Sequence, residues 1–158
     1  MATADNPPRP DLAKLKELIL YVSEASKDDP KFGAVKLNKI LYWADFEAHR
    51  RFGRSITGAE YQHLREGPAP RQLLPARRQL IDEGALELTE RPFYSHVQEI
   101  PTVKRLPNLT GFELAEIELV NDVIDMLREY NGTQVSDLSH REWGWRLTDE
   151  GETIPYRT

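Results

Sequence analysis

The stretch KLNKILYWA, residues 36–44, lies in the most apolar predicted helix of the chain, at about residues 34–52. One stripe of this helix carries apolar side chains at helical spacing, namely Val35, Leu37, Ile40, Leu41, Ala44 and Ala48. Tyr42, Trp43 and Phe46 widen the apolar surface past half of the circumference. Such a helix needs cover on several sides. We therefore expect it to be the central helix of the fold, closed by Gly53.

Four further helices are predicted around it. Apolar residues recur at helical spacing over about 11–26, 70–83, 111–130 and 133–140, and Asp11 is placed to cap the first of these segments. Residues 85–88 and 97–106 are predicted as short strands, which Pro92, Pro101 and Pro107 restrict to edges or ends. Residues 55–64 are predicted as an extended connection and residues 67–70 as a break. The fold class is mainly α (α+β): a compact helical domain of about five helices with a small β-hairpin or short antiparallel sheet.

The composition narrows the class of protein. The chain has 158 residues, which suggests one domain, predicted at 11–158 after a flexible lead-in at 1–10. It has no cysteine, which excludes a disulfide scaffold, a cysteine-ligated metal site and a thiol nucleophile. The longest apolar run, residues 18–22, is far shorter than the ~20 residues of a membrane span. We expect a cytoplasmic protein that is not bound to a membrane.

Charge is divided unevenly along the chain. The net charge is −5, but residues 1–79 hold 14 basic and 10 acidic side chains, whereas residues 80–158 hold 7 and 16. Within residues 50–78 an arginine band opposes only Glu60 and Glu66; its members are Arg50, Arg51, Arg54, Arg65, Arg71, Arg77 and Arg78. Such a band is either a solvated surface or a binding face for an acidic partner.

Motifs of catalysis and of metal or cofactor binding are missing from the sequence. The four histidines, His49, His63, His96 and His140, have no paired spacing of a zinc site. Neither a G-x-S-x-G nucleophile elbow nor a glycine-rich phosphate loop occurs. We therefore expect no catalytic residue, no metal and no cofactor, and hence a protein that is not an enzyme.

One pattern favours DNA binding. A helix that bears Arg71, Arg77 and Arg78, followed by two strands that end at Lys104-Arg105, has the order of a winged helix. The isoelectric point of about 5.4 argues against nucleic acid, because DNA-binding domains are usually basic. A winged-helix-like DNA-binding transcriptional regulator is therefore the alternative function.

Three pieces of the sequence together resemble the Panacea domain, also called the SocA-like antitoxin domain. These pieces are the KLNKILYWA helix, the Gly67-Pro68 pair ahead of a helix with arginine and leucine, and Leu138-Ser139-His140 followed by Trp145. The resemblance spans about residues 12–156 and includes Ile154-Pro155 near the end. The sequence departs from the family pattern at Glu66, Ala69 and Gly144, which affects the shape of two loops.

The resemblance implies a mostly helical fold with a small β element. It also implies an antitoxin of a bacterial or phage-borne toxin–antitoxin system, connected with phage defence. Family members neutralise diverse toxins by direct protein contact, and the founding member also delivers its toxin to an ATP-dependent protease. The implied partners are thus a cognate toxin protein and such a protease, and the oligomeric state stays open.

The residues that match the family motif receive structural roles. They are Lys36, Leu37, Lys39, Tyr42, Trp43, Gly67, Pro68, Ser139, His140 and Trp145. Tyr42 and Trp43 are expected to be core aromatics, with an exposed binding hot spot as the alternative. Gly67-Pro68 is expected to turn the chain. His140 is expected to be a buried imidazole bonded to backbone or to a tyrosine hydroxyl, with partner contact or catalysis as the alternatives.

Two surfaces are candidates for partner binding. One is basic and contains Arg71, Arg77 and Arg78. The other is the acidic side of the helix at about 111–130, with Glu113, Glu116, Asp122 and Asp125. Several toxins act on nucleic acids or nucleotides and are themselves basic, so the acidic surface has the complementary charge.

Overall fold

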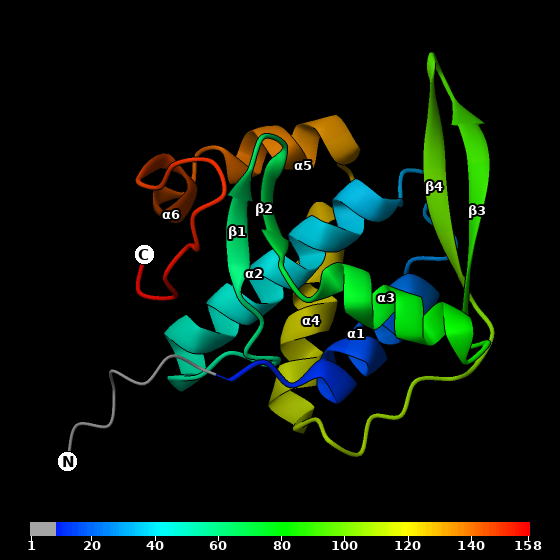
Figure 1. Ribbon diagram of the computed structural model, residues 1–158, viewed down its shortest axis with the longest axis horizontal. Helices are drawn as coiled ribbons and strands as arrows, with labels where there is room; N and C mark the ends of the chain where they lie inside the picture. Colours follow the sequence, from blue (N-terminus) through cyan, green and yellow to red (C-terminus); the bar gives the residue numbers. More distant parts are fainter. Residues whose placement is uncertain (1–8) are drawn as a thin grey trace.

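The structure, a computed structural model, describes residues 9–158, so most of the predicted lead-in lies outside the described residues. Six helices and two small antiparallel sheets follow one another along this part of the chain (Figure 1). The elements are α1 (Leu12–Ala25), α2 (Ala34–Phe52), β1 (Tyr61–Leu64), β2 (Gly67–Pro70), α3 (Leu73–Asp82), β3 (Leu86–Phe93), β4 (His96–Val103), α4 (Leu114–Leu127), α5 (Gly132–Ser139) and α6 (Trp143–Arg146). The predicted fold class, mainly helical with a small β element, is confirmed.

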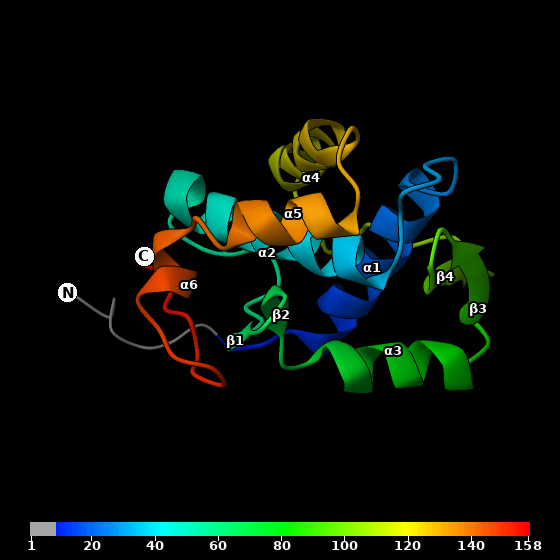
Figure 2. The ribbon, with the colours of Figure 1, turned by 90° about the horizontal axis from the view of Figure 1, so that it is seen from above.

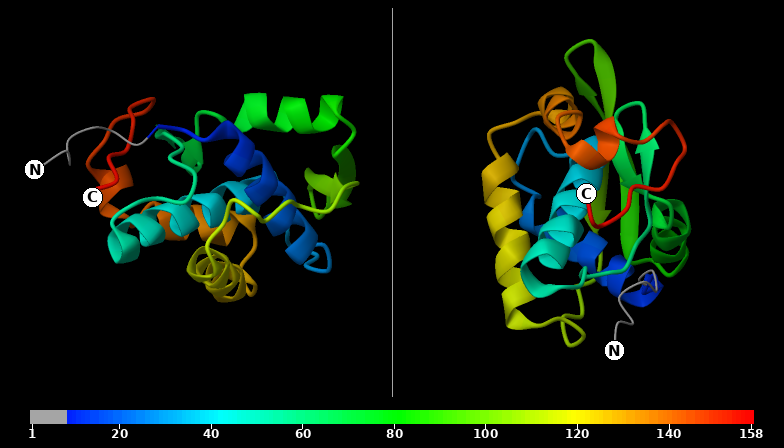
Figure 3. Two further views of the ribbon diagram at one scale, coloured as in Figure 1. Left: turned by 90° about the horizontal axis from the view of Figure 1, so that it is seen from below. Right: turned by 90° about the vertical axis from the view of Figure 1, so that its left-hand side faces the viewer.

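Helix α2 is central, as its wide apolar surface predicts. It contacts α1, α4, α5, β2 and β4. Figure 2 shows α5 along its length and α4, seen nearly end-on, crossing it. Figure 3 shows α4 on one side of α2 with the β1–β2 sheet and α3 on the other. Leu37, Ile40, Leu41 and Ala44 of its stripe are all buried. Gly53 ends the helix with φ of 79°, a left-handed conformation that favours glycine.

The predicted strands at 85–88 and 97–106 form one hairpin, in which the first strand extends further, to Phe93, and the second ends at Val103 rather than at residue 106. Strands β3 and β4 pair antiparallel in a register that sets Leu86 opposite Val103 and Glu90 opposite Glu99. The hairpin stands out from the body of the molecule (Figure 1). Pro92 and Pro101 fit within it because both strands of a two-stranded sheet are edge strands, as the sequence predicts.

The predicted break at residues 67–70 is wrong, because these residues form strand β2. It pairs antiparallel with β1 and sets Tyr61 opposite Pro70. A proline lacks the N–H of an inner strand, yet β2 is an edge strand, so Pro68 and Pro70 are tolerated. The other edge of β1 is covered by the segment after α6, since the Ile154 N–H donates to Tyr61 O at 2.7 Å and the Gly151 N–H donates to His63 O at 2.8 Å.

Helix α4 begins with a capping box that corrects one expectation. Glu116, expected on the outward acidic side, is only 4% exposed. Its carboxylate accepts from the Glu113 N–H at 2.9 Å and forms an ion pair with Lys14 at 3.1 Å. The helix has an apolar inward side at Leu119, Val120, Val123, Ile124 and Leu127.

None of the helices within residues 9–158 is long and apolar enough to cross a membrane.

Replacing Glu116 with alanine will lower the free energy of unfolding by about 1–3 kcal/mol, because the helix loses a cap and Lys14 loses its partner. The matched control is Glu118→Ala, one exposed residue of the same helix. This control will change stability by less than ~0.5 kcal/mol. Urea unfolding followed by circular dichroism measures both changes, and equal values for the two variants would contradict the inward role of Glu116.

Candidate functional site

The residues of the predicted motif meet around the turn that joins β1 to β2. Lys39 reaches this turn from α2, Ser139 and His140 reach it from the end of α5, and Trp145 reaches it from α6. Segments up to 81 residues apart in sequence are thus joined through the backbone of residues 64–68.

Gly67 lies where a side chain cannot fit. Its φ is 113°, and an added Cβ would lie 2.2 Å from the Ser139 Oγ and 2.6 Å from the Lys39 Cε. Ser139 has no exposed surface and its hydroxyl donates to Ser136 O at 2.7 Å, so it cannot move aside cheaply. The predicted turning role of Gly67-Pro68 becomes a close approach between β2, α2 and α5.

Lys39 is a buried amine below this turn. Its side chain is 2% exposed, and its Nζ donates to Pro68 O at 3.0 Å. Burial lowers the pKa of Lys39 to about 8, and the nearby charge of Glu66 opposes the shift. Lys39 therefore holds β2 on α2, although its charged amine loses its hydration by water.

Trp145 is enclosed by two histidines. The ring of His63 stacks on it at 4.2 Å between centroids, and the ring of His140 stacks at 4.1 Å. The Trp145 Nε1–H donates to Leu64 O at 2.9 Å, and the His140 Nε2–H donates to Arg65 O at 3.0 Å. The predicted backbone bond of His140 is confirmed, but the ring is half-buried rather than buried. His63 was not singled out in the sequence, because a lone histidine in a short strand has no distinguishing pattern.

Tyr42 and Trp43 share one carboxylate. Tyr42 is buried and donates its hydroxyl to Glu142 Oε1 at 3.4 Å, whereas the half-buried Trp43 donates Nε1–H to the same oxygen at 3.1 Å. Burial, together with the Glu142 charge, raises the pKa of Tyr42 above its ordinary value. Tyr42 is a core aromatic as predicted, and the pair fixes the loop between α5 and α6.

Lys36 is the second buried lysine of α2. It is 1% exposed, and its Nζ donates to Asp29 Oδ2 at 2.6 Å and to Arg128 O at 3.2 Å. The bond to Arg128 O satisfies a carbonyl at the end of α4. Lys36 therefore connects the loop before α2 to the end of α4.

Asp45 was missed by the sequence reasoning. It has no exposed surface, and its carboxylate accepts from the Ile56 N–H, the Thr57 N–H, the Thr57 hydroxyl and the Tyr61 hydroxyl at 2.6–2.9 Å. Burial raises the pKa of Asp45, against these four bonds that favour its charged form. One signal was available: Asp45 is four residues after Leu41 and eight after Leu37, so it falls on the apolar stripe.

The arginine band does not form one surface. Arg50 and Arg51 bind Glu47, Arg54 binds Glu113, and Arg77 forms an ion pair with Glu99 of β4 at 3.1 Å. Arg71 bonds Gln62, Thr153 and Gly151 O, and so fastens the segment after α6 to β1. Of the three arginines predicted to bind a partner, Arg78 alone is exposed without a hydrogen bond or ion pair among the described residues. A phosphate-binding face on α3 gains no support from this arrangement.

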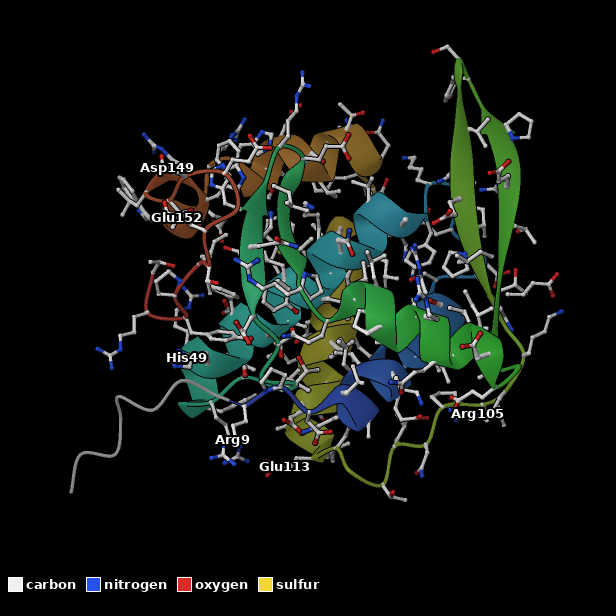
Figure 4. All side chains as sticks on the ribbon, viewed as in Figure 1. Arg9, His49, Arg105, Glu113, Asp149 and Glu152 are labelled. Atoms are coloured by element: carbon white, nitrogen blue, oxygen red, sulfur yellow. The ribbon has the colours of Figure 1, made fainter. Side chains whose placement is uncertain are left out.

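The four acidic residues predicted to bind a partner do not form one surface either. Glu113 lies at the start of α4, at the end of the molecule away from the hairpin (Figure 4), where it binds Arg54. Glu116 is buried, as described above. Asp122 and Asp125 are exposed, and with Glu118 and Glu129 they form one stripe at spacings of four, three and four residues, named the acidic stripe below.

Two motif residues with potentially catalytic side chains are buried. Lys39 and Ser139 have the types of a base and a nucleophile, but at most 2% of either is exposed. No group of three or more possible metal ligands occurs among residues 9–158.

A groove of about 760 Å³ lies beside the motif, between the hairpin, the start of α2 and α5, and Lys36, Glu66 and His140 line it. The motif residues support the fold around this groove.

A family model described as Antitoxin SocA-like, Panacea domain matches residues 37–146, well over half of the chain. The match contains all three motif pieces except Lys36, which precedes it by one residue, and it confirms the resemblance given by the sequence. Neither the curated proteins nor the solved structures that were compared include a significant match.

The close approach at Gly67 predicts a difference between two glycines. Both Gly67 and Gly84 have φ between 74° and 113°, but an added Cβ at Gly84 meets nothing within 4 Å. Gly84→Ala will therefore cost about 1–2 kcal/mol of stability through its backbone alone. Gly67→Ala will cost about 2–5 kcal/mol, since overpacking against Ser139 and Lys39 is added. Thermal unfolding compares the two, and similar losses would show that the contacts at Gly67 are not tight.

Proposed function

Because the chain belongs to the antitoxin SocA-like, Panacea domain family, we propose that it is an antitoxin that neutralises a cognate toxin by direct protein contact. Delivery of the bound toxin to an ATP-dependent protease, as the resemblance implies, is part of the same proposal. The proposed place of action is the cytoplasm, and the proposal involves no catalysis by this chain.

The position of the motif residues supports a binding role. Lys36, Lys39, Gly67 and Ser139 are buried, and their polar groups bond to other parts of the same chain. They are therefore not available to a partner. Contact with the toxin is left to exposed side chains outside the motif, which fits a family whose members share a scaffold and bind different toxins.

The acidic stripe of α4 is the surface that we propose for the toxin. Glu118, Asp122 and Asp125 repel one another because like charges three or four residues apart face each other on a helix. Glu129 lies in the turn two residues after the end of α4. Of the four residues of the acidic stripe, only Asp125 has an ion pair within the described part of the chain, with Arg128 at 3.5 Å. Leu114 and Met126 of the same helix are 74% and 55% exposed. A basic surface with apolar residues would relieve the repulsion and cover both side chains.

The arginine band supports this choice by exclusion. Five of its seven side chains already bind carboxylates or backbone within the chain. A partner on this side would have to break those bonds. The acidic stripe requires no such exchange.

Reversal of charge on the stripe will weaken binding of the toxin. The double variant Asp122→Lys/Asp125→Lys replaces attraction with repulsion, so the dissociation constant for the product of the neighbouring reading frame will rise more than ~10-fold. Cells that express both proteins will then stop growing. Arg78→Glu, a charge reversal on α3, is the control and will keep both affinity and growth.

Two outcomes would contradict different parts of this proposal. A neighbouring product that is harmless alone, or that stays toxic beside the parent protein, would show that the chain is not its antitoxin. A charge-reversed variant that protects as well as the parent would keep the antitoxin role and remove α4 as the contact surface.

A further inference from the structure

A second groove lies on the other side of the loop that joins α1 to α2. It has a volume of about 470 Å³, within the range of ligand-binding clefts. Ser23 of α1 and Ser26, the C-cap residue of α1, form one wall. Phe32 lies at the end of the loop, and residues 100–103 of β4 form the other wall. Figure 1 shows β4 on the side of the hairpin that faces this loop, and Figure 2 shows the loop beside β4.

Two serine hydroxyls in this groove have no partner. Ser23 is 1% exposed and Ser26 is 2% exposed, and neither Oγ has a hydrogen bond among the described residues. A buried hydroxyl without a partner is uncommon, because loss of its hydrogen bonds to water is not compensated. Both side chains are one turn apart on the wall of the same groove. They therefore offer hydrogen bonds that the chain itself does not use.

The free edge of β4 offers further hydrogen bonds. The Lys104 N–H donates to Ala85 O at 2.8 Å, which makes this pair a hydrogen-bonded position of the β3–β4 ladder. Hydrogen-bonded and non-hydrogen-bonded pairs alternate in an antiparallel ladder. The pairs Leu86–Val103 and Leu88–Pro101 are then non-hydrogen-bonded. The backbone groups of Pro101 and Val103 therefore point away from β3, along the edge that lines the groove.

Most charged side chains around the groove are already paired. Lys27 binds Glu24 at 2.9 Å, and Asp29 binds Lys36 at 2.6 Å. Arg91 donates to Pro30 O at 2.9 Å and to Gln98 Oε1 at 3.1 Å, and it has no ion pair among the described residues. A cationic ligand would therefore find no free opposite charge here. Two hydroxyls, a free strand edge and the apolar side chains of Phe32 and Ile100 suit an uncharged chain that both donates and accepts, which is the backbone of an extended peptide.

The groove is also connected to the acidic stripe. Asp29 on its rim binds Lys36, which in turn donates to Arg128 O at the end of α4. Lys31 of the same loop donates to Glu129 O at 2.9 Å. A protein that lies on α4 is thus held next to the loop that forms one side of the groove.

We infer that this groove binds an extended, uncharged segment of the toxin, which lies along the free edge of β4 and bonds to Ser23 and Ser26. The inference rests on the proposed antitoxin function. The segment adds a third strand to the hairpin at residues 101–103, and its backbone supplies the partners of both hydroxyls.

The test measures binding of the purified product of the neighbouring reading frame to the full chain. Ser23→Ala/Ser26→Ala will weaken binding about tenfold, since each net hydrogen bond contributes about 0.5–1.5 kcal/mol. The same variant will unfold at the parent's temperature or above it, because the removed hydroxyls are unsatisfied in the free protein. Val103→Pro, which removes an N–H from the free edge, will weaken binding by a similar factor. Val97→Pro, at the same phase of β4 but outside the groove, is the control and will bind as the parent does.

The outcomes separate this inference from the proposed function. If the parent binds and both groove variants bind as tightly, the groove is not the site and the antitoxin proposal stands. If the serine variant alone keeps full affinity, the hydroxyls are not ligands and the inference as stated is wrong. If the parent itself does not bind, the proposed function fails, and this inference fails with it.

Discussion

Helix α2 carries two buried lysines and one buried aspartate, namely Lys36, Lys39 and Asp45, and the rest of the fold is arranged to satisfy them. A charge removed from water is costly unless it is paired or hydrogen-bonded. Asp29 and the end of α4 satisfy Lys36, β2 satisfies Lys39, and residues 56–61 satisfy Asp45. The segments that surround α2 are therefore fixed by hydrogen bonds as well as by apolar contact, and each charge specifies which segment lies over which turn of the helix.

This arrangement separates the residues that maintain the fold from those that the proposed antitoxin function assigns to partner contact. The motif residues bond inward, to the turn between β1 and β2 and to the loop between α5 and α6. Substitution of a motif residue would therefore disturb the fold rather than a contact with a partner protein. The acidic stripe, the hairpin and the second groove carry few of these internal bonds, so their side chains can change without loss of the central network.

Periodicity predicted five of the helices, missed the short α6, and predicted the polar interior poorly. The bounds of α1 and α2 agree with the sequence within a residue because their apolar stripes are long and their caps, Asp11 and Gly53, are distinct. Strand β2 was missed because glycine and proline usually indicate a break between elements. Its pairing with β1 is what makes these residues an edge strand. Asp45 was missed because a single acidic residue among apolar residues does not form a recognisable sequence pattern. Glu116 was placed outward because its burial is compensated by an ion pair with Lys14, 102 residues away. The family resemblance identified the motif residues, but the network that joins them is visible only in three dimensions.

The pKa of Lys39 tests the central claim most directly, and it can be measured by NMR titration of the Lys39 side chain, assigned with Lys39→Met. The account predicts a value of about 8, since burial below β2 disfavours the charged amine. In the unfolded chain a lysine titrates near ~10.4, so the unfolded state binds more protons between these two values and stability rises with pH across this range. A Lys39 that titrates near ~10.4 in the folded protein would contradict the account, because its amine would then be solvated and β2 would not be held on α2 by a buried charge.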